Sequence, residues 1–171
     1  ANFIYLPAPL DPKKFENIAE IEKKKNQIIY IGRDSYEKGI DILKNIESKI
    51  DGQIVYCTNL PWEKTMELLK SSNLLIVPSR MESIPQVIKE AFYLKVPVIA
   101  TNVGGVSEII ENNVTGILIP SENPEKMTKT INDLLDNNLL MDELTKNAFE
   151  FINKNFTWDI LLSKYIELYE K

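Results

Sequence analysis

The residues best suited to chemistry stand in a short polar segment, Gly32 to Gly39, directly after an apolar run. Arg33 carries a planar guanidinium that can bind two phosphate oxygens at once, and Lys38 carries a mobile ammonium group. Gly32 allows the backbone to turn sharply or to pass close to a ligand. Two cations within six residues suit a diphosphate, and an ordinary solvated loop with a glycine turn remains the alternative. The segment is neither a GxGxxG fingerprint nor a Walker A loop.

A second polar segment, Pro78 to Gln86, follows another apolar run and leads into an amphipathic helix. The first N–H groups of that helix have no intrahelical partner and can bind an anion without any charged side chain. Glu82 precedes the helix and Glu90 follows about two turns later, so their backbones lie roughly 10–12 Å apart. Carboxylates that flank one bond lie about 5–10 Å apart, so this pair better suits two parts of one elongated ligand. Alternatively, Glu90 is a helix-face acid that pairs with a lysine.

A third polar segment, Thr101 to Glu108, again follows an apolar run. Its paired glycines, Gly104 and Gly105, permit close backbone approach or a positive φ, and Ser107 or Glu108 can cap a short helix. A structural role explains these residues as well as a functional one. Each of the three segments is a weak signal by itself, but each follows a predicted strand. The carboxyl ends of parallel strands meet at one edge of a sheet, where ligands bind in open α/β folds.

The elements that must position these segments are short apolar strands that alternate with helices. The strands are apolar throughout, as a sheet covered on both faces requires. The expected strands are Gln27 to Ile31, Gln53 to Cys57, Leu74 to Val77, Val96 to Ala100 and Gly116 to Ile119. The expected helices between them are Gly39 to Ile50, Trp62 to Ser71, Ile84 to Leu94 and Val106 to Glu111. This alternation predicts an α/β fold, a doubly wound (Rossmann-like) parallel sheet of about five to six strands with helices on both faces.

Beyond the last strand the pattern is purely helical, and Asn123, followed by a proline, predicts a helix N-cap. Two further helices are expected over Leu140 to Asn153 and Trp158 to Tyr169. The last helix carries an apolar stripe, and Ile160 and Ile166 lie off it, so a second side is also apolar. The stripe residues are Trp158, Leu161, Leu162, Tyr165 and Tyr169. We find no internal boundary, which predicts a single domain over residues 1–171.

The composition argues against several functions. The net charge of −5 disfavours a broad nucleic-acid surface, and the chain has no histidine, the commonest general base. Cys57 is the single cysteine; we expect it to pack in the core, which fits a reducing compartment. No apolar run is long enough to span a bilayer, and no signal peptide is visible. We interpret the start at Ala1 rather than Met as a piece of a longer chain.

Taken together, these motifs resemble the family 4 (group 1) retaining glycosyltransferases of the two-domain GT-B fold. The resemblance runs from about Ile4 to Tyr169 and is most specific between Pro78 and Pro120. The matching residues are Gly32-Arg33 through Lys38-Gly39, Pro78-Ser79-Arg80-Met81-Glu82, Glu82-x7-Glu90 with Ala91, Val96-Pro97-Val98-Ile99-Ala100-Thr101, Gly104-Gly105-Val106-Ser107-Glu108, Thr115-Gly116 through Pro120, and Phe156-Thr157-Trp158. The resemblance implies the C-terminal half of such an enzyme, a nucleotide-sugar-binding domain without the N-terminal acceptor domain.

The same resemblance implies a role for each candidate residue. Arg33 and Lys38 would hold the diphosphate of a nucleotide sugar. Glu82 would contact the donor sugar as the catalytic residue, and Glu90 would bind the ribose hydroxyls. Backbone near the phosphates or sugar would come from Ser83, Ile84, Pro85 and Gln86, with Gly32, Gly104 and Gly105 as further candidates. No metal ion or cofactor is expected, because cations and helix amides would neutralise the leaving diphosphate.

The implied function is transfer of a glycosyl group of the hexosyl type from a nucleotide-diphosphate sugar to an acceptor, with retention at the anomeric carbon. The implied partners are the nucleotide sugar and the missing N-terminal domain of the same polypeptide, against which the second apolar side of the last helix would pack. The chain alone is then expected to be inactive. We expect a cytoplasmic location and no transmembrane segment, with any peripheral contact to the inner face of the membrane made through the missing half.

The chain departs from the family pattern in three places. Ser83-Ile84 stands where the family has Phe-Gly, which removes a flexible glycine near the donor sugar. Lys95 replaces a glycine, and we expect this change to affect a turn. The region between Ile50 and Leu74 lacks one strand–helix piece. That region usually contributes to the base pocket, so the base of the donor is left undefined.

Other classes of protein stay open. A nucleotide-sugar epimerase half-domain shares the architecture but would ordinarily use histidine. A receiver-type signalling domain needs clustered aspartates after the first strand, where Asp34 stands alone beside Arg33. A non-catalytic nucleotide-binding module also fits the pattern.

Overall fold

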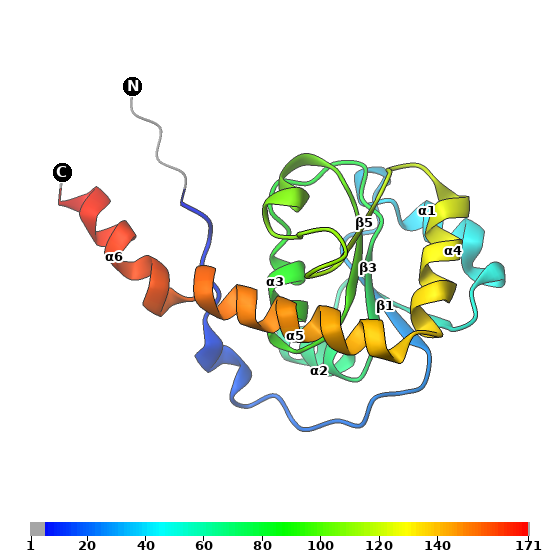
Figure 1. The fold of residues 1–171 in the computed structure, drawn as a ribbon, viewed down its shortest axis with the longest axis horizontal. Coiled ribbons are helices and arrows are strands. Elements are labelled where there is room, and N and C mark those ends of the chain that lie inside the picture. The colour runs from blue at the N-terminus through cyan, green and yellow to red at the C-terminus, as the bar shows by residue number, and fades with distance from the viewer. Residues whose placement is uncertain (1–5, 171) are drawn as a thin grey trace.

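The computed structural model describes residues 6–170, which form a parallel sheet with helices on both faces (Figure 1). The strands are β1 (Gln27–Ile31), β2 (Gln53–Cys57), β3 (Leu74–Val77), β4 (Val98–Thr101) and β5 (Ile117–Ile119). They lie in the order β2-β1-β3-β4-β5, and every neighbouring pair is parallel. The predicted doubly wound α/β fold is therefore confirmed. Ile4, where the family resemblance begins, lies outside the described residues.

The helices cover the two faces of the sheet in pairs. They are α1 (Ile40–Ile46), α2 (Trp62–Lys70), α3 (Gln86–Tyr93), α4 (Pro124–Leu135), α5 (Asn138–Asn155) and α6 (Trp158–Tyr169). Short 3-10 segments are η1 (Pro12–Phe15), η2 (Tyr36–Lys38), η3 (Glu47–Lys49) and η4 (Gly104–Glu108). Helices α2 and α3 pack on one face, α1 and α4 pack on the other, and α5 touches both α3 and α4 (Figure 1).

Two hydrophobic cores flank the sheet because successive strand residues point to opposite faces. In the central strand β3, Leu75 and Val77 join the core under α2 and α3, whereas Leu74 and Ile76 join the core under α1 and α4. All four side chains are buried, which explains why the strand is apolar throughout. Cys57 is buried at the end of β2, as expected.

Two prolines move element boundaries away from the sequence-based expectation. The helix expected from Ile84 begins at Gln86, because Pro85 disfavours helical backbone at the residue before it. The strand expected from Val96 begins after Pro97, which has no N–H to donate to a ladder.

Two helices expected near glycines differ from the prediction: one α-helix is shorter, and the other is a 3-10 segment. The helix expected over Gly39 to Ile50 starts after Gly39, which has a left-handed φ of 68°, and its last turn is the 3-10 segment η3. The helix expected over Val106 to Glu111 is instead the 3-10 segment η4, which starts at the glycine pair. Neither Ser107 nor Glu108 caps η4, because Val103 occupies the N-cap position.

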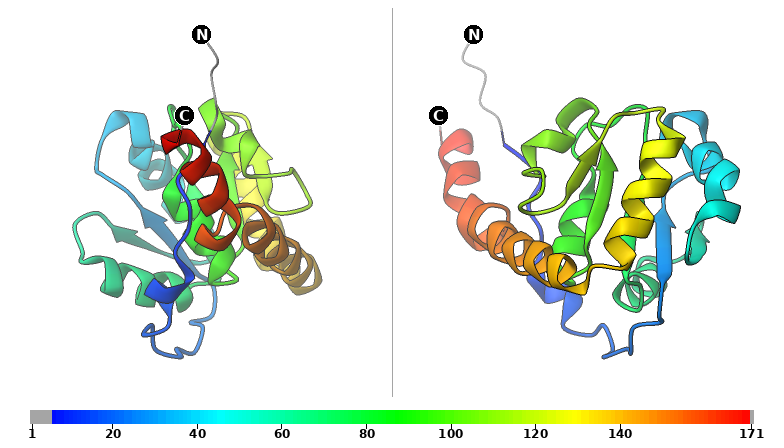
Figure 2. Two further views of the ribbon diagram at one scale, coloured as in Figure 1. Left: turned by 90° about the vertical axis from the view of Figure 1, so that its left-hand side faces the viewer. Right: turned by 45° about the vertical axis from the view of Figure 1, so that its right-hand side comes forward.

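The C-terminal helices form as predicted, but the last one does not use its apolar stripe as core. Asn123 caps α4 by accepting a hydrogen bond from the Lys126 amide at 2.9 Å. Within α6, Leu161 is buried whereas Trp158 and Leu162 are exposed. The helix lies to one side of the sheet layers, next to the N-terminal segment (Figures 1 and 2). None of the helices in residues 6–170 has the length and apolar character needed to cross a membrane.

The loops at the carboxyl edge of the sheet are packed backbone to backbone through glycines. Gly39, in the loop after β1, lies so close to the loop after β3 that an added Cβ would be 2.1 Å from the Pro78 carbonyl oxygen. Gly104, in the loop after β4, has a φ of 53°, and its Cβ would be 1.7 Å from the Glu82 carbonyl oxygen. Three loops from three strands therefore meet at this edge.

Replacing Gly104 with alanine should lower the free energy of unfolding by about 2 kcal/mol or more, because the residue combines a left-handed φ with a backbone overlap. Gly116→Ala is the matched control: its nearest neighbour would be 3.1 Å from the new Cβ, and its φ is not left-handed. Urea denaturation followed by circular dichroism measures both losses. Equal losses in the two variants would contradict the close packing of these loops.

Candidate functional site

The order of the strands creates a switch point between β1 and β3. These two strands are neighbours, yet the chain leaves β1 toward β2 and leaves β3 toward β4 on the opposite side. In open α/β sheets the crevice at such a point, outside the carboxyl ends of the strands, is where ligands bind. The loops that follow β1 and β3 here are the segments that contain Arg33, Lys38 and Glu82. Arg33, Lys38 and Glu82 therefore lie in loops at the edge of the sheet where ligands bind in this class of fold.

Lys38 and Glu82 come together across this switch point. The Lys38 Nζ lies 2.7 Å from the Glu82 Oε1, and the Glu82 side chain is 8% exposed. The Ser79 hydroxyl donates a second hydrogen bond to the same oxygen at 2.8 Å. The Thr101 hydroxyl, at the end of β4, in turn donates to the Ser79 carbonyl. Lys38 and Ser79, from the loops after β1 and β3, thus contact the Glu82 carboxylate directly, and Thr101 supports the backbone of Ser79.

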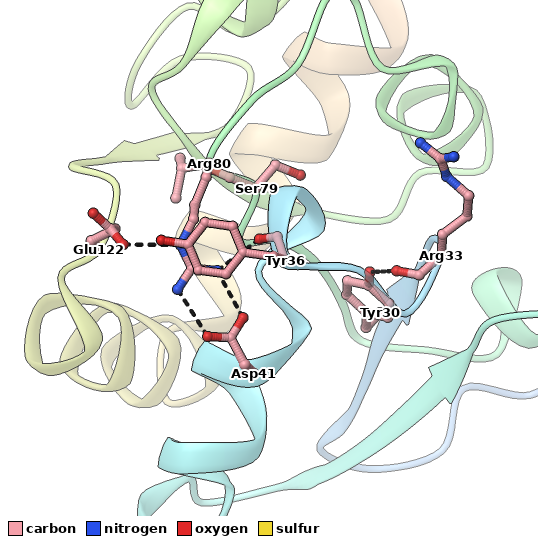
Figure 3. Close-up of polar contacts among 8 residues, drawn as sticks. Tyr30, Arg33, Tyr36, Asp41, Ser79, Arg80 and Glu122 are labelled. Atoms are coloured by element: carbon pink, nitrogen blue, oxygen red, sulfur yellow. Dashed lines mark hydrogen bonds and ion pairs between the residues drawn. The ribbon is translucent and has the colours of Figure 1, made fainter.

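Arg33 has a fixed backbone and an exposed side chain. Its carbonyl accepts a hydrogen bond from the Tyr30 hydroxyl at 2.6 Å, and burial raises the pKa of Tyr30 to about 12, which keeps this donor protonated. The Arg33 guanidinium points away from the neighbouring polar network (Figure 3). It forms no hydrogen bond or ion pair within residues 6–170. The guanidinium is therefore available to a ligand, although it does not share the Lys38–Glu82 contact.

Glu90 is half-buried on α3 rather than fully solvated. The indole N–H of Trp62, at the start of α2, donates to its Oε1 at 2.9 Å. Burial raises the pKa of Glu90, and the Trp62 hydrogen bond together with the charges of Lys89 and Lys14 opposes the rise. The alternative that Glu90 pairs with a lysine is wrong, because its hydrogen-bond partner is a tryptophan. The sequence offered no sign of Trp62, which is 28 positions away.

The start of α3 presents backbone groups to the same edge. Pro85 occupies the N-cap position and makes no side-chain cap, so the first helical amides are not satisfied by a capping side chain. Ser83 and Gln86 are exposed, Ile84 is half-buried and Pro85 is buried.

The candidate glycines lie behind these groups and shape their loops. Gly105 packs against the Ser83 carbonyl as Gly104 does against that of Glu82. A Cβ at Gly32 would lie 2.9 Å from the Tyr30 hydroxyl.

Arg80 is the residue that sequence reasoning missed. Its guanidinium forms a two-pronged ion pair with Asp41, at 2.7 and 2.8 Å, and its Nε donates to Glu122 at 2.9 Å (Figure 3). It also donates to the Tyr36 carbonyl at 2.7 Å, and the Tyr36 ring covers it at 3.9 Å. Sequence separations of 39 and 42 positions to its acidic partners hide this arrangement from local patterns.

A cavity of about 640 Å³ lies away from this site, at the amino-terminal edge of the sheet. Among its lining residues are Phe15, Lys23, Lys70, Tyr93, Lys95 and Phe149. Lys95, which stands where the family resemblance predicts a glycine, keeps a left-handed φ of 56°, so it occupies a turn as expected. Its Nζ lies 4.7 Å from the centre of the Phe149 ring. None of the candidate residues lines this cavity, so we do not assign the site to it.

Comparison with known proteins agrees with this geometry. The chain is 29% identical over 167 residues to an uncharacterized glycosyltransferase of Methanocaldococcus jannaschii, with 84% of this chain and 47% of that protein covered. Sucrose-phosphate synthase from Thermosynechococcus elongatus superimposes with a TM-score of 0.85 at 22% identity, over 96% of this chain and 51% of that one. Anabaena HepE, solved in complex with UDP-glucose, gives a TM-score of 0.78 at 18% identity, over 85% and 49%. At these identities, the two structures show a shared fold.

A family model matches the chain over residues 46–151. The chain spans about half the length of the first curated relatives it matches. The model of the family "Glycosyl transferases group 1" matches residues 46–151, which is more than half of this chain and includes β3, Glu82, Glu90 and the glycine pair. The chain therefore belongs to the group 1 glycosyl transferases.

Proposed function

We propose that the chain forms the donor-binding half of a retaining glycosyltransferase, which moves a glycosyl group from a nucleotide-diphosphate sugar to an acceptor. The observation that carries the proposal is the ion pair between Lys38 and Glu82 at 2.7 Å, at the switch point of the sheet. It sets a cation suited to phosphate beside a carboxylate suited to sugar hydroxyls. The complex of HepE with UDP-glucose supports this class of donor.

Stabilising the departing diphosphate is the main electrostatic task of such a reaction. Lysine has three N–H donors, so Lys38 can contact a phosphate oxygen while it keeps Glu82. The exposed guanidinium of Arg33 adds a second positive charge, and the amides at the start of α3 add partial positive charge without desolvating a side chain. These groups supply the neutralising charge themselves, so we propose no metal ion or cofactor.

The two carboxylates have separate roles in this proposal. Glu82 contacts the donor sugar, and the backbone of residues 83–86 lies along the sugar or the phosphates. Glu90 accepts hydrogen bonds from the ribose hydroxyls through the oxygen that Trp62 does not use. Ile84 in place of the family's glycine puts a bulkier, stiffer residue on the sugar side.

The rest of the enzyme is assigned to a second half of the same polypeptide, which would bind the acceptor. The exposed apolar side chains of α6, among them Trp158, Ile160 and Ile166, offer a surface for that half. We place the enzyme in the cytoplasm, with any contact to the inner face of the membrane made by the other half.

Removing either proposed phosphate ligand should weaken binding of a nucleoside diphosphate by about 1–3 kcal/mol, the range for losing a charged hydrogen bond. The variants are Arg33→Ala and Lys38→Ala. Lys129→Ala is the control, because Lys129 pairs with Asp133 on the exposed surface of α4. A thermal-shift screen of UDP, GDP and ADP selects the ligand, and calorimetric titration measures affinity. Unchanged affinity in both variants would remove the phosphate assignment.

Glu90→Gln should weaken nucleotide binding and yet raise Tm at neutral pH. Burial raises the pKa of Glu90, so the ionised carboxylate is penalised in the folded chain at any pH above its unfolded pKa. The advantage of glutamine should vanish below about pH 4.3, the unperturbed glutamate value, where the carboxyl is protonated in both states. Calorimetric melting at both pH values checks this, with the exposed Glu63→Gln as control. A lower Tm for Glu90→Gln at neutral pH would contradict the buried-charge account.

The chain alone should show no glycosyl transfer with saturating donor, because acceptor binding is assigned to the other half. A turnover assay with the 171-residue chain and with the full-length protein tests this division. Equal turnover by the two proteins would refute it.

A further inference from the structure

Arg80 lies among three loops at the carboxyl edge of the sheet and is nearly saturated by protein contacts (Figure 3). A guanidinium has five N–H donors. Four of the five are used here: one by Glu122, one by the Tyr36 carbonyl and two by the Asp41 carboxylate. The ring of Tyr36 covers one face of the guanidinium at 3.9 Å, and the side chain is 16% exposed. Arg80 is therefore turned into the protein rather than toward a ligand.

The contacts of Arg80 converge on the loop that carries Lys38. Tyr36, whose carbonyl it binds, stands two positions before Lys38, and the Arg80 amide donates to the Glu37 carbonyl at 2.8 Å. Asp41 stands three positions after Lys38, in the first turn of α1. Arg80 thus holds the chain on both sides of Lys38. The contact of Gly39 with Pro78 and the Lys38–Glu82 pair join the same loop to the loop after β3.

The two acidic partners of Arg80 differ in strength. The Asp41 pair has paired, parallel hydrogen bonds, and this contact holds the pKa of Asp41 below its usual value. Glu122 is 61% exposed, and an exposed single contact contributes little. Glu122 lies in the loop after β5, so the contact still connects that loop to the loop after β3. The hydrogen bonds of Arg80 to Asp41 and to the Tyr36 carbonyl are therefore stronger than its contact with Glu122.

We propose that Arg80 is a positioning residue: it holds the Tyr36–Asp41 segment so that Lys38 reaches both Glu82 and the diphosphate. This inference rests on the proposed function, because it acts through Lys38 as a phosphate ligand. Lysine cannot replace Arg80 in this role, because an ammonium group lacks the planar set of N–H donors with which the guanidinium binds both Asp41 and the Tyr36 carbonyl.

The test is a double-mutant cycle between Arg80→Lys and Lys38→Ala in the 171-residue chain. The probes are inorganic pyrophosphate, which has neither base nor sugar, and UDP, GDP and ADP, each titrated calorimetrically. Circular dichroism and Tm establish that each variant is folded at the titration temperature. Lys129→Ala, which breaks an exposed ion pair with Asp133 on α4, is the control.

Arg80→Lys should weaken binding of pyrophosphate and of the preferred nucleotide by the same factor, about tenfold, because a displaced ligand group loses much of its effect. In the Lys38→Ala background the same change should cost less than about twofold, because the group that Arg80 positions is already gone. Asp41→Asn should also weaken binding of both ligands, but by a smaller factor. It replaces Arg80→Lys in the test if that variant does not fold.

Four results would overturn the proposal. Unchanged affinity in Arg80→Lys and Asp41→Asn would show that the loop holds its place without Arg80. A full tenfold loss in the Lys38→Ala background would show that Arg80 acts on the ligand independently of Lys38. Wild-type protein that binds none of the four probes would remove the proposed function and, with it, this role. Binding that is lost in Lys38→Ala but kept in Arg80→Lys would reject the positioning role alone.

Discussion

The ion pair between Lys38 and Glu82 joins two loops that leave adjacent strands in opposite directions, and the arrangement of the site depends on it. A largely buried carboxylate loses its hydration, and its attraction to one cation seldom repays that loss without further hydrogen bonds. Here Ser79 supplies one such bond, and Thr101 holds Ser79 in turn. The hydrogen bond from Ser79 offsets part of the desolvation of Glu82 and fixes the direction in which its carboxylate points.

In the proposed site, some groups at the carboxyl edge of the sheet would contact the ligand and others hold those groups in place. The Arg33 side chain is exposed, and no side chain caps the amides at the start of α3. Behind them, Tyr30 holds the Arg33 carbonyl and Arg80 holds the loop on either side of Lys38. In the proposed reaction such support matters, because electrostatic stabilisation of a leaving group requires donors that are already in place.

At Glu90, as at Glu82, a hydrogen bond offsets part of the cost of burying a carboxylate. Its carboxylate is buried beside Trp62, and the indole hydrogen bond offsets part of the desolvation that raises its pKa. An apolar side chain would fill that position with less loss of free energy. The exposed apolar residues of α6, such as Trp158 and Ile166, likewise carry a cost in water. The proposed donor-binding half, which would work together with a second surface, accounts for both features.

The sequence by itself determined the fold class, the bounds of β1, β2, β3 and α6, and the edge at which the candidate residues gather. These follow from local periodicity and from the rule that parallel strands place their carboxyl ends together. Only the tertiary structure decided which side chains meet. Lys38 and Glu82 are 44 positions apart, and Arg80 and Asp41 are 39 apart. Such contacts depend on strand order and loop packing, and periodicity along the chain contains no information about either.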